Sequence, residues 1–191
     1  MLLIKNIGTL ATPLGTSSRC GSDQGKIEVL HNAAVLIDGE KIAAVTANGE
    51  LPEYSAYADI VDAHGALATP GLVDAHTHLG IIEDGLDFEG DDCNEATDPF
   101  TPQMRAIDGI NPFDRCFEEA RMRGITAVAS SPGSANACGG EICAVKTDGR
   151  RIDDMLIRTV GIKFALGENP KNVYNGKDET PITRMAVTAH I

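Results

Sequence analysis

The stretch ATPGLVDAHTHLG, residues 68–80, decides how the rest of the chain is interpreted. Its central part, LVDAHTHL at 72–79, is predicted to be a β-strand. Side chains alternate along a strand, so His76 and His78 share one face, roughly 6 to 7 Å apart. Two neutral imidazoles near the carboxyl end of a strand suit a divalent metal, and the alternative is one core and one surface histidine. Asp74 lies on the same face, either as an acceptor for an imidazole or as a buried carboxylate with a backbone partner.

Residues 1–68, which lead up to the start of this stretch, are predicted to form a small antiparallel β unit. In AAVLIDGEKIAAV (33–45), two β-rich runs flank Asp38-Gly39, a strong signal for a hairpin turn. Further elements are expected as strands at LLIKNI (2–7) and DIVDA (59–63) and as a loop at PLGTSSRCGSDQGK (13–26).

From residue 69 to residue 191 the pattern changes to strands alternating with helices, which indicates βα units in a parallel sheet or barrel. The expected elements are strands at ITAVAS (125–130), EICAVKT (141–147) and VGIKFAL (160–166), with a weaker helix at 152–157. The last segment, ITRMAVTAHI (182–191), begins a helix without a C-terminal cap, so we expect a truncated chain.

One helix is predicted with both of its ends. Asn111-Pro112 supplies an N-cap and a proline at the first helical position, and Gly124 ends the helix. Its apolar face is formed by Phe113, Cys116, Phe117 and Ala120.

Composition excludes several classes of protein. The chain has 28 Asp and Glu against 16 Lys and Arg, a formal net charge of −12, which argues against nucleic acid or anionic lipid as a partner. No run approaches the roughly 18 to 20 apolar residues of a membrane span, and the N-terminus is a poor signal peptide. The five cysteines are expected to be reduced thiols. We therefore expect a soluble, cytoplasmic protein.

The run 68–80, preceded by a β-rich unit containing DGEKIAAV (38–45), resembles the amidohydrolase superfamily. The family motif PG-[LF]-[VI]-D-x-H-x-H is matched position for position, by Pro70, Gly71, Leu72, Val73, Asp74, His76 and His78. Downstream, TDPFTPQMRAIDGINPFD (97–114) and IKFALGENPKNVY (162–174) are similar to the imidazolonepropionase-like and dipeptidase-like branch. The resemblance implies an α/β fold, with part of a composite β-sandwich at 1–68 and the first strands of a (β/α)₈ TIM barrel at 69–191. It covers the whole chain but only about half of a typical member.

The resemblance also implies a metal centre with one or two divalent ions, zinc foremost. His76 and His78 match the ligands of the first metal. Lys163 matches the carboxylated lysine of dipeptidase-like relatives, and Glu168 is the alternative bridging carboxylate. A lysine in an apolar strand fits carbamylation because burying an ammonium ion is unfavourable; the alternative is a lysine that only packs. Two further histidine ligands and the catalytic aspartate of the family are expected beyond this chain.

Other segments are weaker candidates. Residues 83–98 contain eight acidic residues and no basic one, and they would lie at the catalytic mouth of a barrel or form a solvated loop. Arg105 is a candidate for binding a substrate carboxylate. Ser134 and Asn136 are expected to line the pocket or to form a plain turn.

These features predict a metal-dependent amidohydrolase that hydrolyses a C–N amide bond in a cyclic amide or dipeptide-like substrate through metal-activated water. This chain would carry the first half of the site and be inactive alone. A deaminase of the same superfamily is one alternative, and a non-catalytic fragment or partner-dependent half-barrel is the other. The expected partner is a small-molecule substrate, and a homo-oligomer is left open.

Overall fold

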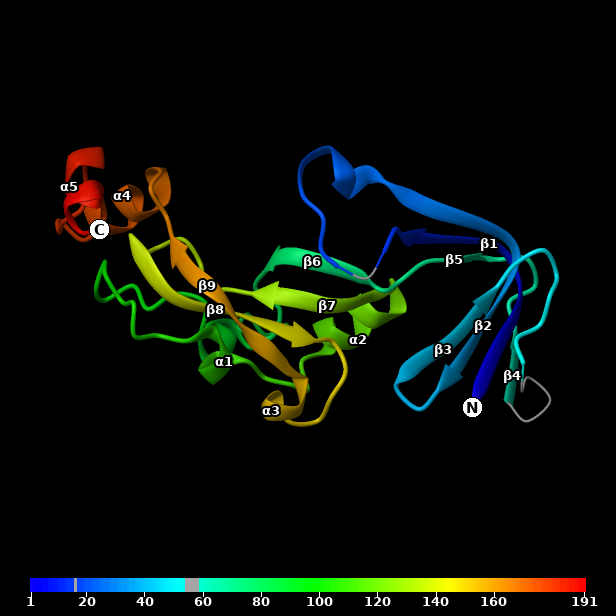
Figure 1. The fold of residues 1–191 in the computed structure, drawn as a ribbon. Helices are drawn as coiled ribbons and strands as arrows, with labels where there is room; N and C mark the ends of the chain where they lie inside the picture. Colours follow the sequence, from blue (N-terminus) through cyan, green and yellow to red (C-terminus); the bar gives the residue numbers. More distant parts are fainter. Residues whose placement is uncertain (16, 54–58) are drawn as a thin grey trace. The chain divides into compact units, whose positions relative to one another are not determined.

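Residues 1–15, 17–53 and 59–191 are described in the computed structural model, where they form two units with one sheet each, Met1–Pro70 and Gly71–Ile191 (Figure 1). Strands and helices are both present, in agreement with the predicted mixed α/β class, and strands predominate. Within these residues no helix combines the length and apolar character that a membrane crossing requires.

The first unit is a mixed sheet with the strand order β3-β2-β1-β4, and β5 also pairs with β1. Its strands are β1 (Leu2–Pro13), β2 (Ile27–Asp38), β3 (Lys41–Thr46), β4 (Asp59–Asp62) and β5 (Leu67–Ala68). The hairpin at Asp38-Gly39 is confirmed: Asp38 pairs with Lys41, and Gly39 has a φ of 58°, which a two-residue turn requires.

The prediction of an entirely antiparallel unit is wrong, because β4 and β5 both run parallel to β1. β3 and β4 both run in the direction of β1. They are joined by residues 47–58, which is longer than the tight turn that would reverse the chain between antiparallel neighbours. Antiparallel pairing is therefore limited to β1–β2 and β2–β3.

Both faces of this sheet contribute to its core. Residues 33–36 of β2 are all buried: Ala33 and Val35 pack with Ile7 and Leu10, whereas Ala34 and Leu36 pack with Leu3. Alternating side chains of one strand thus supply two apolar clusters. A continuous apolar run is the expected pattern for a strand that is covered on both faces.

The second unit contains a four-stranded sheet with the order β6-β7-β8-β9. Its strands are β6 (Leu72–Thr77), β7 (Ile125–Ser130), β8 (Cys138–Lys146) and β9 (Leu156–Phe164). The prediction of a uniformly parallel sheet is wrong: β6 and β7 are parallel, but β8 is antiparallel to both β7 and β9. A parallel crossover needs a dozen or more residues, and the connections 131–137 and 147–155 are shorter than that.

The helices of the second unit are short. They are α1 (Ala106–Gly109), α2 (Arg115–Met122), α3 (Ile152–Met155), α4 (Glu168–Asn175) and α5 (Arg184–Ala189), with a 3₁₀ turn η3 at Asp87–Gly90; the first unit has a 3₁₀ turn η1 at Gly21–Gly25. Helix α2 packs against β7, and Phe117 of α2 joins Ile81, Val128 and Val145 in the main core cluster.

Helix α2 begins later than predicted. The Asp114 side chain accepts the backbone N–H of Cys116 at 3.0 Å and is the N-cap, whereas Asn111 accepts the N–H of Phe113 in a turn before the helix. Phe113 therefore precedes the helix and is 75% exposed instead of lying on its apolar face. The predicted C-terminal glycine is confirmed, since Gly124 follows the C-cap with a φ of 80°.

Candidate metal centre

The parallel pair β6–β7 positions His76 and His78 at the carboxyl end of β6. His76 lies within the strand and His78 directly follows its last residue. Their ring centroids are 5.5 Å apart and the rings are perpendicular. The structure therefore brings the two predicted ligands together.

The ring of His78 is fixed by a hydrogen bond to the main chain. Its Nδ1 lies 2.7 Å from the carbonyl oxygen of Ser131, the residue that follows β7. A carbonyl oxygen can only accept, so Nδ1 carries the proton. In the neutral ring, Nε2 then keeps its lone pair free for a metal, which is the arrangement typical of metal-binding histidines.

Asp74, the third polar residue on this face, has a backbone partner. Its Oδ1 accepts the N–H of His76 at 3.1 Å, and its side chain is exposed. The predicted backbone partner of Asp74 is present, but the carboxylate is exposed and not buried as expected. The acceptor of the His78 ring is a main-chain carbonyl instead of Asp74.

The spacing of the two imidazoles fits a shared divalent ion. A tetrahedral ion bonded to two imidazole nitrogens at about 2.0 to 2.1 Å places the ring centroids about 5 Å apart. The centroids of His76 and His78 are 5.5 Å apart. Across residues 1–15, 17–53 and 59–191, no set of three His, Cys, Asp or Glu side chains is close enough to hold a metal ion. The pair supplies two ligands, and further ligands must come from other groups.

Lys163 lies in β9, where its backbone pairs with Gly140 of β8. Its side chain is only 8% exposed, and its stem passes Gly139. Burial raises the pKa of the Cys93 thiol and Asp91 adds to that rise, whereas the Gly133 N–H and the Lys163 ammonium oppose it. Lys163 thus lies near Cys93, and no described residue offers it a hydrogen bond or an ion pair.

Glu168, the other predicted bridging carboxylate, is the first residue of α4 and is exposed. It shares a cavity of about 300 Å³ with Lys163 and Ser134. His76 and His78 do not line this cavity. The four predicted metal ligands therefore form two groups, a histidine pair at β6 and a lysine–glutamate pair after β9.

Arg105 is held by a bidentate ion pair with Asp108. Its Nε and Nη2 donate to the two carboxylate oxygens at 2.8 and 2.6 Å. This hydrogen-bonded pair raises the pKa of Arg105 and lowers that of Asp108. Both residues are exposed and line a cavity of about 710 Å³.

Most charges lining this cavity are negative. Asp91, Asp92 and Glu95 come from the predicted acidic segment, and Lys177 is a cation from the region after α4. The Lys177 ammonium donates to the Ala96 carbonyl oxygen and lies 5.3 Å from the centroid of the Tyr174 ring. This lysine therefore anchors the acidic segment.

Asn136 is buried and holds the same segment from the other side. Its Nδ2 donates to the carbonyl oxygens of Glu95 and Asp98 at 2.6 and 2.7 Å and lies 3.2 Å from the Thr101 hydroxyl. Its amide donors are thus satisfied by the protein, which gives the side chain a structural task.

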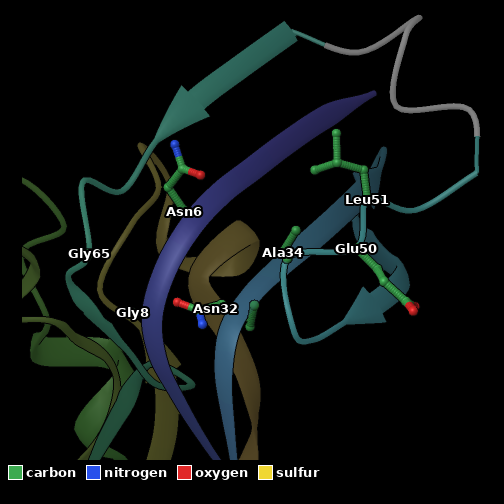
Figure 2. A pocket seen from close by; sticks show the side chains of 9 residues that line it. Asn6, Gly8, Asn32, Ala34, Glu50, Leu51 and Gly65 are labelled. Carbon is green, nitrogen blue, oxygen red and sulfur yellow. The ribbon is translucent and has the colours of Figure 1, made fainter.

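The first unit has a smaller cavity of about 190 Å³, in which Asn6, Asn32, Glu50 and Leu51 surround a close approach of two backbone segments (Figure 2). A Cβ at Gly8 would lie 2.2 Å from the carbonyl oxygen of Gly65, so only glycine fits there. None of the predicted site residues lines this cavity.

Three residues that support the site were not predicted from the sequence: Ser130, Ser131 and Lys177. Ser130 ends the apolar strand ITAVAS and Ser131 follows it. These serines could have been noticed in the sequence, because buried hydroxyls need hydrogen-bond partners. Nothing in the sequence marks the Ser131 carbonyl or the partner of Lys177, since both depend on tertiary pairing.

No protein-family model matches the chain. The amidohydrolase tasK of Hapsidospora irregularis is 38% identical over 164 residues, which are 79% of this chain and 17% of that protein. The imidazolonepropionase of Caldanaerobacter subterraneus subsp. tengcongensis is 44% identical over 78 residues, 41% of this chain and 18% of that protein.

A solved structure is similar to nearly the whole chain. The crystal structure of an amidohydrolase from Thermotoga maritima MSB8 has a TM-score of 0.82 and 36% sequence identity, and the match covers 99% of this chain and 45% of that one. This chain spans less than half the length of these relatives.

Proposed function

The chain belongs to the amidohydrolase superfamily, and from this we propose that the protein is a metal-dependent hydrolase of a C–N amide bond in a cyclic amide or dipeptide-like substrate. The observation that carries the proposal is the histidine pair: two imidazoles 5.5 Å apart, one with its Nδ1 bonded to a carbonyl. This donor arrangement suits a divalent ion, for which zinc is the first candidate.

A divalent ion bound by His76 and His78 would lower the pKa of a bound water to near neutral and polarise the substrate carbonyl. His78 offers Nε2 as a ligand while its Nδ1 remains bonded to Ser131. The exposed carboxylate of Asp74 holds the main chain of His76 in place.

We propose Lys163 over Glu168 as the second group of the centre. Lys163 is 8% exposed as a residue and makes no hydrogen bond or ion pair with a described residue, although its Nζ is not fully buried. Glu168 is exposed. Carbamylation of Lys163 would replace an ammonium by an anion, and the carbamate could bind metal. A two-ion centre of this kind favours amide hydrolysis over the one-ion deaminase alternative.

The remaining ligands and the proton-transferring aspartate are proposed to lie in the part of the relatives' length that this chain does not span. We also propose that β6, β7 and β9, which run in one direction, are strands of a (β/α)₈ barrel. The reversed strand β8 would be a departure from the regular barrel pattern.

The substrate is expected to reach the acidic cavity beside Arg105. To bind a substrate carboxylate, Arg105 must exchange Asp108 for that group. Asn136 is not retained as a substrate contact, because its donors are bonded to the acidic segment.

Metal binding by the histidine pair tests this proposal. Zinc titrated into the chain by calorimetry should bind, and His76→Ala or His78→Ala should abolish the heat. His190→Ala, which removes a histidine from the C-cap of α5, is the matched control and should bind like the unsubstituted chain. Equal binding by all variants would contradict the proposal.

Substrate class is tested with the same protein. The zinc-loaded chain, combined with the part of a relative that this chain does not span, should release product from a cyclic amide or a dipeptide. Release of ammonia from an amidine-containing ring, with one ion bound, would instead identify the deaminase.

A further inference from the structure

The ends of β6 and β7 are joined by hydrogen bonds that surround His78. The N–H of Ser131 donates to the carbonyl oxygen of Thr77 at 3.0 Å, and the hydroxyl of Ser130 donates to that of Leu79 at 2.9 Å. The ring Nδ1 of His78 lies 2.7 Å from the Ser131 carbonyl oxygen. Residues on both sides of His78 and its own ring are therefore tied to two consecutive serines.

We propose that Ser130 and Ser131 are positioning residues which, before any metal binds, set the His78 ring in the tautomer that presents Nε2. This inference rests on the proposed function, because it assigns a purpose to that choice of nitrogen. Ser131 acts through its main-chain carbonyl, and Ser130 acts through its hydroxyl, which holds the chain just after His78.

Burial makes this arrangement effective. Both serines are buried, so water does not compete for the Ser131 carbonyl. Pro132 follows directly, and a residue that precedes proline is restricted to extended conformations, which limits the directions in which the Ser131 carbonyl can point. A histidine with a fixed tautomer loses less freedom when it binds an ion.

His76 provides the contrast. Its backbone N–H is bonded to Asp74, but within the described residues its ring makes no hydrogen bond and lies edge-on to the His78 ring. The His78 ring is thus held in its orientation before a metal binds, whereas the His76 ring can reorient when the metal binds.

The two serines differ in a way that allows a matched test. The Ser130 hydroxyl bonds Leu79, on the histidine strand, whereas the Ser131 hydroxyl bonds the carbonyl of the adjacent Pro132 at 3.0 Å. Ser130→Ala removes a tie to β6, and Ser131→Ala removes a buried hydroxyl of equal size but keeps the carbonyl acceptor.

The first measurement is nitrogen NMR of the metal-free chain, recorded at a pH well above the ordinary imidazole pKa of about 6.5. His78→Asn assigns the His78 signals. We expect His78 to be the Nδ1–H tautomer with a slowly exchanging ring proton. The Nε2–H tautomer, or rapid averaging of the two, would overturn the inference without any variant being needed.

The second measurement compares the variants. Ser130→Ala should raise the Nε2–H population of His78 and weaken zinc binding by about 10- to 100-fold, the usual effect of losing a group that orients a metal ligand. Ser131→Ala should keep the tautomer and the zinc affinity. If the two variants behave alike, Ser130 has no specific part in positioning His78 and the inference fails.

The tautomer is read without metal, so the two proposals can fail separately. An Nδ1–H tautomer in a chain whose zinc binding is unchanged by His76→Ala and His78→Ala would refute the metal-dependent function and support the positioning of the ring. Zinc binding through His76 and His78 with an averaged tautomer would do the reverse.

Discussion

Lys163 is a single residue whose environment calls for a chemical explanation. It is 8% exposed in a strand, beside the Cys93 thiol and with no acceptor among the described residues. A buried ammonium is unfavourable unless its charge is paired or removed. Its stem passes Gly139, and the residue lines the cavity that it shares with Glu168.

If Lys163 is carbamylated, Lys163→Gln should lower the number of bound ions from two to one when the chain is combined with the part of a relative that it does not span, and Glu168→Gln should leave the number unchanged. The physical reason is that only an amine can take up bicarbonate-derived CO₂ to become an anionic ligand. Elemental analysis gives the metal count, and labelled bicarbonate followed by carbon NMR detects the carbamate. The opposite pattern would identify Glu168 as the bridging residue.

Two cysteine thiols with raised pKa values, one buried and one partly buried, predict how stability depends on pH. Burial raises the pKa of Cys116 to about 12, with Asp114 contributing, and that of Cys143 to about 11. Unfolded thiols ionise near 8.5 to 9, so between that pH and 11 the folded state binds more protons than the unfolded state. The free energy of unfolding should therefore fall as pH rises through this range. Urea denaturation at several pH values measures it.

A substitution assigns this effect. Cys143→Ala should reduce the slope of stability against pH above about 9, because it removes one of the shifted groups. Cys20→Ala is the control, since Cys20 is exposed. A slope that is the same in all three chains would assign the pH dependence to other groups.

At the scale of elements, the start of β8 is fitted against the segment that precedes α1. The backbone of Arg105 forms an isolated parallel β-bridge with that of Glu141, and the backbone of Phe100 forms another with that of Cys138. Between them Gly140 has a φ of 111°, and a Cβ there would lie 2.3 Å from the Met104 carbonyl oxygen. Only glycine permits this approach.

Gly140→Ala should therefore lower the free energy of unfolding by more than about 2 kcal/mol, because it adds both backbone strain and a clash with main-chain atoms. Gly161→Ala in β9 is the matched control: the nearest atom to the added Cβ, outside the adjoining residues, belongs to the Ile142 side chain at 4.0 Å. That variant should be neutral or slightly more stable. Urea denaturation of both decides, and equal stability would show that the segment is not tightly docked.

Local patterns in the sequence predicted the elements that depend on neighbours in the chain. The turn at Asp38-Gly39 and the strand at 125–130 are confirmed. Directions and caps depend on more: β8 is reversed because its connections are short, and Asp114 displaces Asn111 as the N-cap. The histidine pair was predictable from alternation along one strand, but the acceptor of His78 was not, because every residue type carries the same main-chain carbonyl.

At the scale of the whole molecule, the outer strands of the second sheet carry exposed apolar side chains. β6 and β9 are the two edges of that sheet. Val73 is 70% exposed on β6, and Ile162 is 47% exposed on β9. Edge strands with apolar side chains are sites where further chain pairs or packs. The superfamily relatives are more than twice as long, which offers material to cover these edges.

The isolated chain should therefore self-associate as its concentration rises. Sedimentation velocity over a dilution series measures this, and Val73→Lys combined with Ile162→Lys should shift the chain toward monomer. Phe88→Lys, which removes a 91% exposed apolar side chain from the 3₁₀ turn η3, is the control and should not change the distribution. A monomer at every concentration would mean that the edges are protected in some other way.

Residues 131–137, the connection from β7 to β8, carry the acceptor of His78, the buried Asn136 amide and Ser134 of the cavity beside Lys163. Surface connections ordinarily accept insertions and deletions during evolution because little depends on their length. Here one inserted residue would displace the histidine support, the anchor of the acidic segment and a cavity wall together. Divergence among descendants of this sequence should therefore change side chains within this connection while its length stays constant.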